Sequence, residues 1–197
     1  MATPLAHGLA GYGVYLLAAP RRERSGVALA IACAVAGIAP DLDFIPGIAL
    51  GSPALFHQGI SHSLAAAAVA GALLASLPVA RETRWRERWG ILTLAYASHL
   101  VLDLFGPDRR APYGIPLLWP ITDATFLAPI TLLPGVRHAR TTTVETAEWI
   151  RRVLDPRNLM ALLIEAGVFV PFVVLARAAR RRAGARAGTA GQPSPDR

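Results

Sequence analysis

Apolar residues along the chain gather in five segments that are separated by polar or Gly/Pro-rich stretches. Each segment is somewhat shorter than the roughly 20 residues with which a helix crosses a hydrocarbon core, and the second could be a buried or half-inserted helix. Polar residues at headgroup depth and snorkelling Arg side chains extend the usable length. The pattern therefore predicts an all-α, polytopic membrane bundle of about five apolar helices. They cover about residues 4–19, 26–39, 63–80, 90–105 and 159–176.

Composition agrees with a membrane protein. Hydrophobic residues make up 53% of the chain, charged residues only 17%, and the mean hydropathy is +0.41. These values are too apolar for an ordinary soluble domain. The formal net charge is +7, and all 20 basic residues are Arg. Because the Arg residues cluster at the ends of apolar segments, we attribute the charge to membrane topology. We expect membrane lipid as a partner and no nucleic acid.

Three Arg clusters set the predicted topology. They follow the first, third and fifth apolar segments, and short basic loops are retained on the cytoplasmic side. Five spans with an external N-terminus then place the beginning of the first segment, the loop 44–62 and the end of the fourth segment at the outer face. The clusters are Arg21, Arg22 and Arg24; Arg81, Arg84, Arg86 and Arg88; and Arg177, Arg180, Arg181, Arg182 and Arg186.

The region 106–157 is predicted to be a long external connection. It begins with a Gly/Pro-rich stretch that has turn chemistry. Thr142 and Glu145 form a capping-box pattern, which predicts an amphipathic helix over about 143–154 at the membrane interface. Residues 1–183 are predicted to form a single domain. The Ala/Gly/Pro/Ser-rich residues 184–197 are predicted to be a disordered tail.

Candidate chemistry begins with His99 and Asp103 in the fourth apolar segment. Four residues apart on a helix, the two side chains leave the same face about one turn from each other. An H-x-x-x-D pair alone is weak and is ordinarily a chance polar pair. Inside an apolar segment it gains weight, because an ionisable side chain at membrane depth is costly without a partner.

Further candidates follow the second segment. Pro40 ends the predicted helix, and Asp41 and Asp43 stand directly after it. Two adjacent carboxylates repel each other unless a cation or proton separates them, although a turn residue and a helix cap are the simpler interpretation. His57 and His62 precede the third segment, where each alone could be a solvent-exposed loop residue. Ser61 and Ser63 could cap that helix or orient an imidazole.

These residues converge on the predicted outer face, together with His7, which alone would be a polar anchor. Mixed nitrogen and oxygen ligands fit Zn²⁺, and Mn²⁺ or Fe²⁺ less well. We expect one or two ions, with Asp103 as the bridging carboxylate. Metal-activated water would attack an ester or phosphoester, with Asp41 or Asp43 as a possible base. The expected metal ligands are His7, Asp41, Asp43, His57, His62, His99 and Asp103.

Two basic residues and one acidic residue each allow more than one role. Arg109 and Arg110 follow Asp103 closely and could either receive a phosphate or form a solvated basic pair. Glu165 lies inside the last apolar segment, where a structural partner is the favoured interpretation.

The ordered motifs resemble a known family. An early His, then Pro-Asp-Leu-Asp, then His-x-Gly-x-Ser-His-Ser and finally His-x-x-x-Asp before a Gly/Pro loop resemble the YdjM family. That family comprises LexA-regulated bacterial inner-membrane proteins described as metal-dependent hydrolases. The resemblance covers about residues 5–120 and implies that the same seven residues are its polar positions. Gln58 and Ser61 stand where the family has Arg and Thr.

A second resemblance is more distant. The Asp43-to-His57 spacing and the His99/Asp103 pair are similar to the helical zinc-dependent phospholipase C and P1 nuclease superfamily, without a match to its later His and Glu ligands.

Together these features predict a metal-dependent hydrolase of the bacterial inner membrane, acting on a phosphoester or a lipid headgroup. The alternatives are a non-catalytic polytopic membrane protein, whose polar residues only stabilise the bundle, and a metal-binding carrier, for which Glu165 is the one hint of a polar path.

Overall fold

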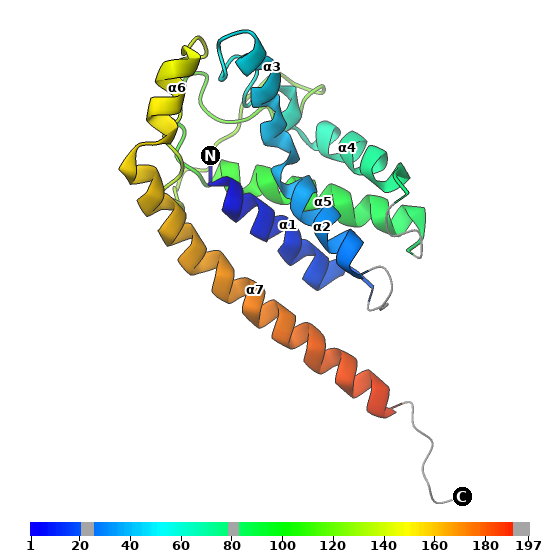
Figure 1. Ribbon diagram of the computed structural model, residues 1–197. Coiled ribbons are helices and arrows are strands. Elements are labelled where there is room, and N and C mark those ends of the chain that lie inside the picture. The colour runs from blue at the N-terminus through cyan, green and yellow to red at the C-terminus, as the bar shows by residue number, and fades with distance from the viewer. Residues whose placement is uncertain (21–25, 79–82, 191–197) are drawn as a thin grey trace, which may run out of the picture.

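The computed structural model describes residues 1–20, 26–78 and 83–190, and this part of the chain is helical without a β-strand (Figure 1). The predicted all-α class is confirmed. The elements are α1 (Pro4–Ala18), α2 (Gly26–Ile38), the 3₁₀ helix η2 (Ala39–Asp43), α3 (Phe44–Ala49), the 3₁₀ helix η3 (Ile60–His62), α4 (Leu64–Ser76), α5 (Trp85–Leu104), α6 (Thr146–Val153) and α7 (Pro156–Ala190).

Helix α5 lies at the centre of the bundle and contacts α1, α2 and α4. Its apolar face buries Leu92 and Ala95 against Leu29 and Cys33 of α2. Burial of this kind stabilises a fold by about 25 cal/mol per Å² of apolar surface. Because α5 is enclosed on several sides, polar side chains near its C-terminal end are also enclosed.

Glycine allows α1 and α2 to approach each other closely. A Cβ atom on Gly37 would collide with the backbone carbonyl of His7, and one on Gly11 would collide with the carbonyl of Cys33. Small residues at such contacts allow backbone-to-backbone packing of apolar helices. This contact brings the first turns of α1 against the C-terminal end of α2.

Helix α7 forms hydrogen bonds with residues at both ends of α1. At the start of α1, the Thr3 N–H donates to Glu165 Oε2 over 2.7 Å, while Thr3 Oγ1 accepts from the Ala6 N–H as a helix cap. At the end of α1, the Arg180 guanidinium donates to carbonyl groups that the helix leaves without partners, including that of Ala19 at 2.8 Å. Glu165 thus has the structural partner that the sequence favoured.

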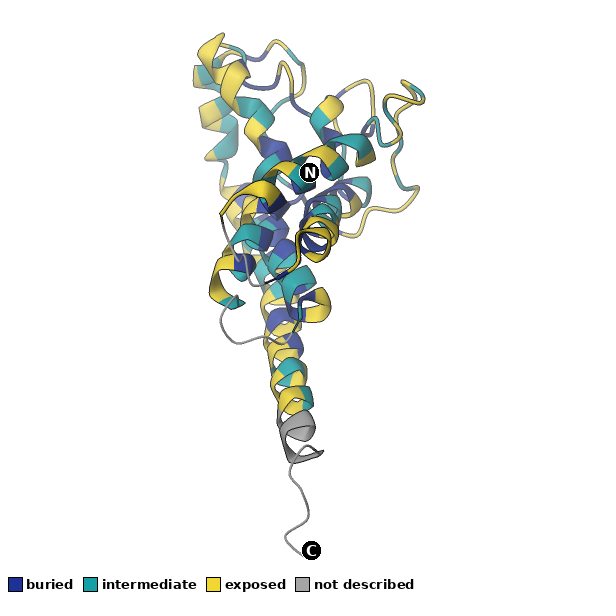
Figure 2. Cartoon of the chain, turned by 90° about the vertical axis from the view of Figure 1, so that its right-hand side faces the viewer, coloured by how far each residue is buried: buried dark blue, intermediate teal, exposed yellow. Residues whose placement is uncertain are grey.

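Two stretches are long and apolar enough to cross a membrane by length and composition: 26–49, which joins α2, η2 and α3, and 156–184 of α7. Helix α4 is a shorter apolar helix. Apolar side chains such as Val27, Leu73 and Leu175 are exposed. Figure 2 shows exposed positions along much of the helices. The positions Arg21, Arg22, Arg24 and Arg81 of the predicted cytoplasmic clusters lie outside the described residues.

The structure differs locally from the expected boundaries. Pro40 ends α2 as expected, yet the chain stays helical, because Pro40 occupies the first turn of η2, where its missing N–H breaks no helical bond. The segment 44–62, expected as a loop, therefore begins with helix α3.

The capping-box prediction at Thr142 and Glu145 is wrong. Helix α6 begins at Thr146, and its N-cap Glu145 makes no side-chain cap hydrogen bond. Ser52 Oγ lies within hydrogen-bond distance of the carbonyls of Thr142 and Val144, so residues 142–145 approach the helix as a turn that Ser52 holds in place. At the other end of the chain, α7 continues to Ala190, and residues 191–197 lie outside the described residues.

Candidate metal centre

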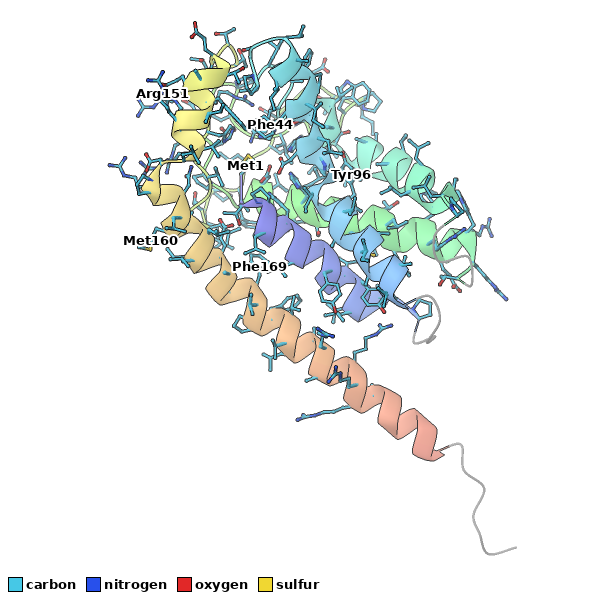
Figure 3. The ribbon with its side chains drawn as sticks, viewed as in Figure 1. Met1, Phe44, Tyr96, Arg151, Met160 and Phe169 are labelled. Atoms are coloured by element: carbon cyan, nitrogen blue, oxygen red, sulfur yellow. The ribbon has the colours of Figure 1, made fainter. Side chains whose placement is uncertain are left out.

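Four elements place the candidate ligands in one buried cluster. His7 comes from α1, Asp41 and Asp43 from η2, His62 from η3, and His99 and Asp103 from α5, while His57 lies in the loop before η3. Each of the four histidines is no more than 4% exposed and Asp41 is 9% exposed. Phe44 and Tyr96, labelled in Figure 3, belong to the elements that enclose the cluster.

Four ligand atoms face one another at the centre of the cluster and are here called the inner atoms: Asp41 Oδ1, His62 Nε2, His99 Nε2 and Asp103 Oδ2. His62 Nε2 and His99 Nε2 are 3.2 Å apart, and each lies 3.5 Å from Asp103 Oδ2. Asp41 Oδ1 lies 3.5 Å from His99 Nε2 and 3.9 Å from His62 Nε2. Metal–ligand bonds of about 2.0–2.1 Å in a tetrahedral site imply ligand–ligand separations of about 3.3–3.4 Å. The spacing of the inner atoms is therefore close to that of a zinc site.

Buried polar atoms without hydrogen-bond partners also support a metal ion at this position. Both carboxylate oxygens of Asp41 and Oδ2 of Asp103 make no hydrogen bond within the protein. A buried carboxylate oxygen without a partner is costly, and such atoms are rare in folded proteins. Two of these three oxygens are inner atoms, so a cation among the inner atoms would compensate them.

The outer nitrogens of the two central imidazoles are fixed by other groups. His99 Nδ1 donates to the Gly37 carbonyl over 2.9 Å, which leaves its Nε2 lone pair directed at the centre. His62 Nδ1 lies 3.3 Å from Asp43 Oδ2 and 3.0 Å from Ser61 Oγ. A carboxylate or carbonyl on the outer nitrogen is the usual way in which a metal-ligating histidine is oriented. Ser61 is thus placed where the sequence suggested an orienting role.

His7 lies beside the inner atoms. Its ring stacks on that of His99 with a centroid separation of 3.6 Å, and its Nε2 lies 3.4 Å from Asp103 Oδ1. The same Oδ1 accepts a hydrogen bond from the Ala2 N–H over 3.1 Å. The two oxygens of Asp103 therefore face different histidines, the arrangement that a bridging carboxylate requires.

His57 belongs to a loop that Arg110 holds in place. Its Nδ1 lies 2.9 Å from Asp43 Oδ1, its ring stacks on Phe44, and its buried Nε2 has no hydrogen-bond partner. The Arg110 guanidinium donates to the carbonyls of Ala54 and His57, at 2.8 and 2.6 Å, and to Gln58 Oε1. Arg110 is therefore not part of a solvated basic pair, because its guanidinium is buried and holds this loop.

Backbone strain marks the same loop. Gln58 has a φ of 61°, a left-handed conformation that residues other than Gly rarely adopt. Such a conformation persists only where surrounding contacts impose it. The three hydrogen bonds from Arg110 supply those contacts and so position His57.

The histidines outside the apolar helices differ in their pKa values. Burial lowers the pKa of His57 to about 3, so this ring is neutral at pH 7. Burial also acts to lower the pKa of His62, but the nearby carboxylates of Asp103 and Asp43 outweigh it and raise the pKa to about 9. Without a cation at the centre, a proton on His62 therefore compensates the carboxylates at pH 7.

A cavity of about 550 Å³ opens beside this cluster. Asp43, His57 and Ser61 line its inner part, and the exposed apolar side chains of Phe56 and Ile60 line its rim. A volume in this range accommodates a small-molecule ligand. The cavity is a route by which a substrate with an apolar portion could reach the cluster.

The structure brings all seven predicted residues together, but they occupy different positions relative to the centre of the cluster. Asp41, His62, His99 and Asp103 supply the inner atoms, whereas Asp43 faces the outer nitrogens of His57 and His62. Six of the seven, all except Asp43, form three overlapping groups of three whose ligand atoms lie within 4.8 Å of one another. Sequence reasoning missed the orienting contacts of the Gly37 carbonyl and of Arg110, because neither residue type indicates such a contact from sequence alone.

Comparison with known proteins supplies one match. A family model described as YdjM inner membrane protein matches residues 1–183. Neither the curated proteins nor the solved structures yield a significant match. The similarity to zinc-dependent phospholipase C and P1 nuclease therefore rests on residue spacing alone.

Proposed function

The chain belongs to the YdjM inner membrane protein family, and we propose that it is a membrane-bound, metal-dependent hydrolase acting on a phosphoester or lipid-headgroup substrate. The observation that carries the proposal is the set of inner atoms, which come from three separate elements and place the two imidazole nitrogens 3.2–3.9 Å from each other and from the two carboxylate oxygens. Bundle stability alone does not require two imidazole nitrogens and two carboxylate oxygens to converge away from solvent.

Zn²⁺ is the proposed ion, held by Asp41, His62, His99 and Asp103. When bound there, a zinc ion that takes a water as an additional ligand would lower the pKa of that water to about 7 and would polarise a phosphoryl oxygen. A second ion would use Asp103 Oδ1 and His7 Nε2, which lie 3.4 Å apart. The nitrogen and oxygen donors favour zinc over Mg²⁺ or Ca²⁺, which prefer oxygen ligands.

Asp43 is the better placed of the two carboxylates proposed as a base. Asp41 contributes an inner atom, whereas Asp43 lines the 550 Å³ cavity from which a substrate would approach. Asp43 accepts a hydrogen bond from Ser61 Oγ over 2.6 Å and contacts His57 Nδ1. We assign to the Asp43–His57 pair the handling of the proton released at the site.

The proposed location is the bacterial inner membrane, with several spans and the metal centre at the outer face. The family description and the two long apolar stretches support the membrane assignment. The apolar residues Ile150 and Leu154 near α6 are exposed, which supports an interfacial position for that helix. The cluster lies at the end of the bundle opposite the Arg-rich end of α7 (Figure 1).

The test is to measure metal content and hydrolysis on the same detergent-purified sample. We expect stoichiometric zinc and a phosphodiesterase or lipid hydrolase activity that a chelator abolishes and zinc restores. His99→Ala should remove both the metal and the activity, whereas Arg151→Gln, at an exposed position of α6, should change neither. Metal binding without any hydrolysis would favour the carrier, and absence of metal from the folded wild-type protein would favour the non-catalytic bundle.

A further inference from the structure

A small hollow beside the metal centre is rich in arginine. It has a volume of about 120 Å³, and its lining includes Arg109, Arg137 and Arg140 together with Gln58 and His138. Pockets that enclose a whole small molecule measure roughly 300–1,000 Å³, so this one suits a single charged group. We call it the arginine hollow.

The three guanidinium groups lie near one another without acidic partners. Among the described residues, no carboxylate is within 4.0 Å of the guanidinium of Arg109, Arg137 or Arg140, although the ion pairs of neighbouring arginines are present. Desolvation lowers the pKa of Arg109, and the positive charges of Arg137 and Arg140 lower it further. Like charges held together in this way indicate a place for an anion.

The acidic residues of the hollow are engaged elsewhere. Asp108 accepts hydrogen bonds from the Gly114 N–H at 2.6 Å and the Arg110 N–H at 3.0 Å. Asp155 accepts the Arg157 N–H at 2.8 Å and pairs weakly with its guanidinium. Neither carboxylate forms an ion pair with Arg109, Arg137 or Arg140, so the arginines of the hollow leave an excess of positive charge there.

The hollow adjoins the metal centre and the substrate cavity. His138 lines the hollow and packs edge-on against His57, with ring centroids 5.0 Å apart. Gln58 and Arg110 line both the hollow and the 550 Å³ cavity. An anionic group in the hollow would thus lie next to a substrate in the cavity.

We propose that the arginine hollow binds a phosphate group with two negative charges, which anchors a substrate beside the metal centre. The inference rests on the proposed hydrolase function and narrows its substrate to a compound with a terminal phosphate or diphosphate. Three unpaired guanidinium groups match the charge and the oxygen atoms of such a group, because guanidinium binds phosphate through paired hydrogen bonds. The phosphate belongs either to a lipid headgroup or to a free anion.

Binding is measured on the full-length protein in detergent with two probes: inorganic phosphate, and phosphatidic acid in mixed micelles with phosphatidylcholine micelles as the blank. We expect saturable binding that weakens as salt rises. The double variant Arg137→Gln/Arg140→Gln should weaken it by about tenfold or more, since hydrogen bonds to charged groups are strong. Arg151→Gln should bind as the wild type does, because Arg151 does not line the hollow. Preference for phosphatidic acid identifies a lipid phosphate, and equal binding identifies a free anion.

The inference is overturned if the wild type shows no saturable binding of either probe, or if Arg151→Gln loses as much affinity as the double variant. Arg137→Lys provides a milder variant, expected to retain part of the affinity as a point charge. The binding assay is repeated on His99→Ala. If His99→Ala still binds phosphate and the wild type shows no hydrolysis, only the hydrolase proposal is wrong. If the wild type shows metal-dependent hydrolysis but binds no phosphate, only this inference is wrong.

Discussion

Asp43 illustrates how one residue can act on the centre without supplying an inner atom. Its two oxygens contact the outer nitrogens of His57 and His62, at 2.9 and 3.3 Å. Those contacts set the direction in which the imidazoles present their remaining nitrogens. The sequence grouped Asp43 with Asp41, since adjacency in a turn does not reveal which carboxylate faces which side of a ring.

Asp43→Asn should weaken metal affinity by about 10–100-fold, the usual cost of losing an orienting carboxylate. The amide keeps the size of the side chain but loses the charge and one acceptor. Competition against a chromophoric chelator measures the change, with Asp123→Asn at an exposed position as the control. Unchanged affinity in Asp43→Asn would show that His62 is oriented by other groups.

Arg110 stabilises the strained loop that carries His57. Arg110→Gln removes the charged donor from the carbonyls of Ala54 and His57, so we expect a loss of about 1–3 kcal/mol in the free energy of unfolding. Arg109→Gln at the exposed neighbouring position should lie within about 0.5 kcal/mol of the wild type. Thermal unfolding in detergent compares the variants, and equal stability of the two would contradict the role given to Arg110.

At the scale of elements, the contact between α1 and α2 couples packing to the metal centre. Gly37 takes part in both the packing and the metal centre. Because it has no side chain, the His7 carbonyl can pack against it, and its own carbonyl accepts a hydrogen bond from His99 Nδ1. A side chain at this position would separate the two helices and move both histidines.

Gly37→Ala should therefore lower both thermal stability and metal affinity. Gly90→Ala is the matched control: a Cβ there meets nothing within 4 Å, and the change should raise stability slightly through helix propensity. The two variants are compared by thermal unfolding and chelator competition. Retained metal affinity in Gly37→Ala would mean that the helix contact is independent of the site.

The elements themselves were largely predictable from apolar patterning. A helix occupies each of the five apolar segments, although only 26–49 and 156–184 have the length and hydropathy of a span. The late start of α6 was not predictable, because the contact of Ser52 with the Thr142 carbonyl depends on tertiary packing. Local sequence signals do not encode such partners.

For the whole molecule, the sequence predicted which polar residues would gather but not their arrangement. Their positions at the ends of apolar segments predicted convergence, and the structure brings His7, Asp41, His62, His99 and Asp103 together. The division into inner atoms and orienting groups depends on which ring nitrogen faces inward. That choice is made by partners remote in sequence, such as Gly37 for His99.

The outer-face topology gives a prediction at this scale. In a Cys33→Ala background, Leu50→Cys, an exposed position after α3, should react with a membrane-impermeant maleimide in spheroplasts. Arg182→Cys, exposed near the Arg-rich end of α7, should react only after permeabilisation. The reverse labelling pattern would place the metal centre on the cytoplasmic side.

The most direct test of the metal centre is X-ray absorption at the zinc edge of the purified, zinc-loaded wild-type protein. The inner atoms and a bound water predict an ion with four or five ligands, all nitrogen or oxygen at about 2.0–2.2 Å, and two imidazoles in the outer-shell scattering. Replacing His99 by Ala should reduce the imidazole contribution. A spectrum of a six-coordinate, fully hydrated ion, or failure of the folded protein to retain zinc, would contradict a metal centre built from these residues.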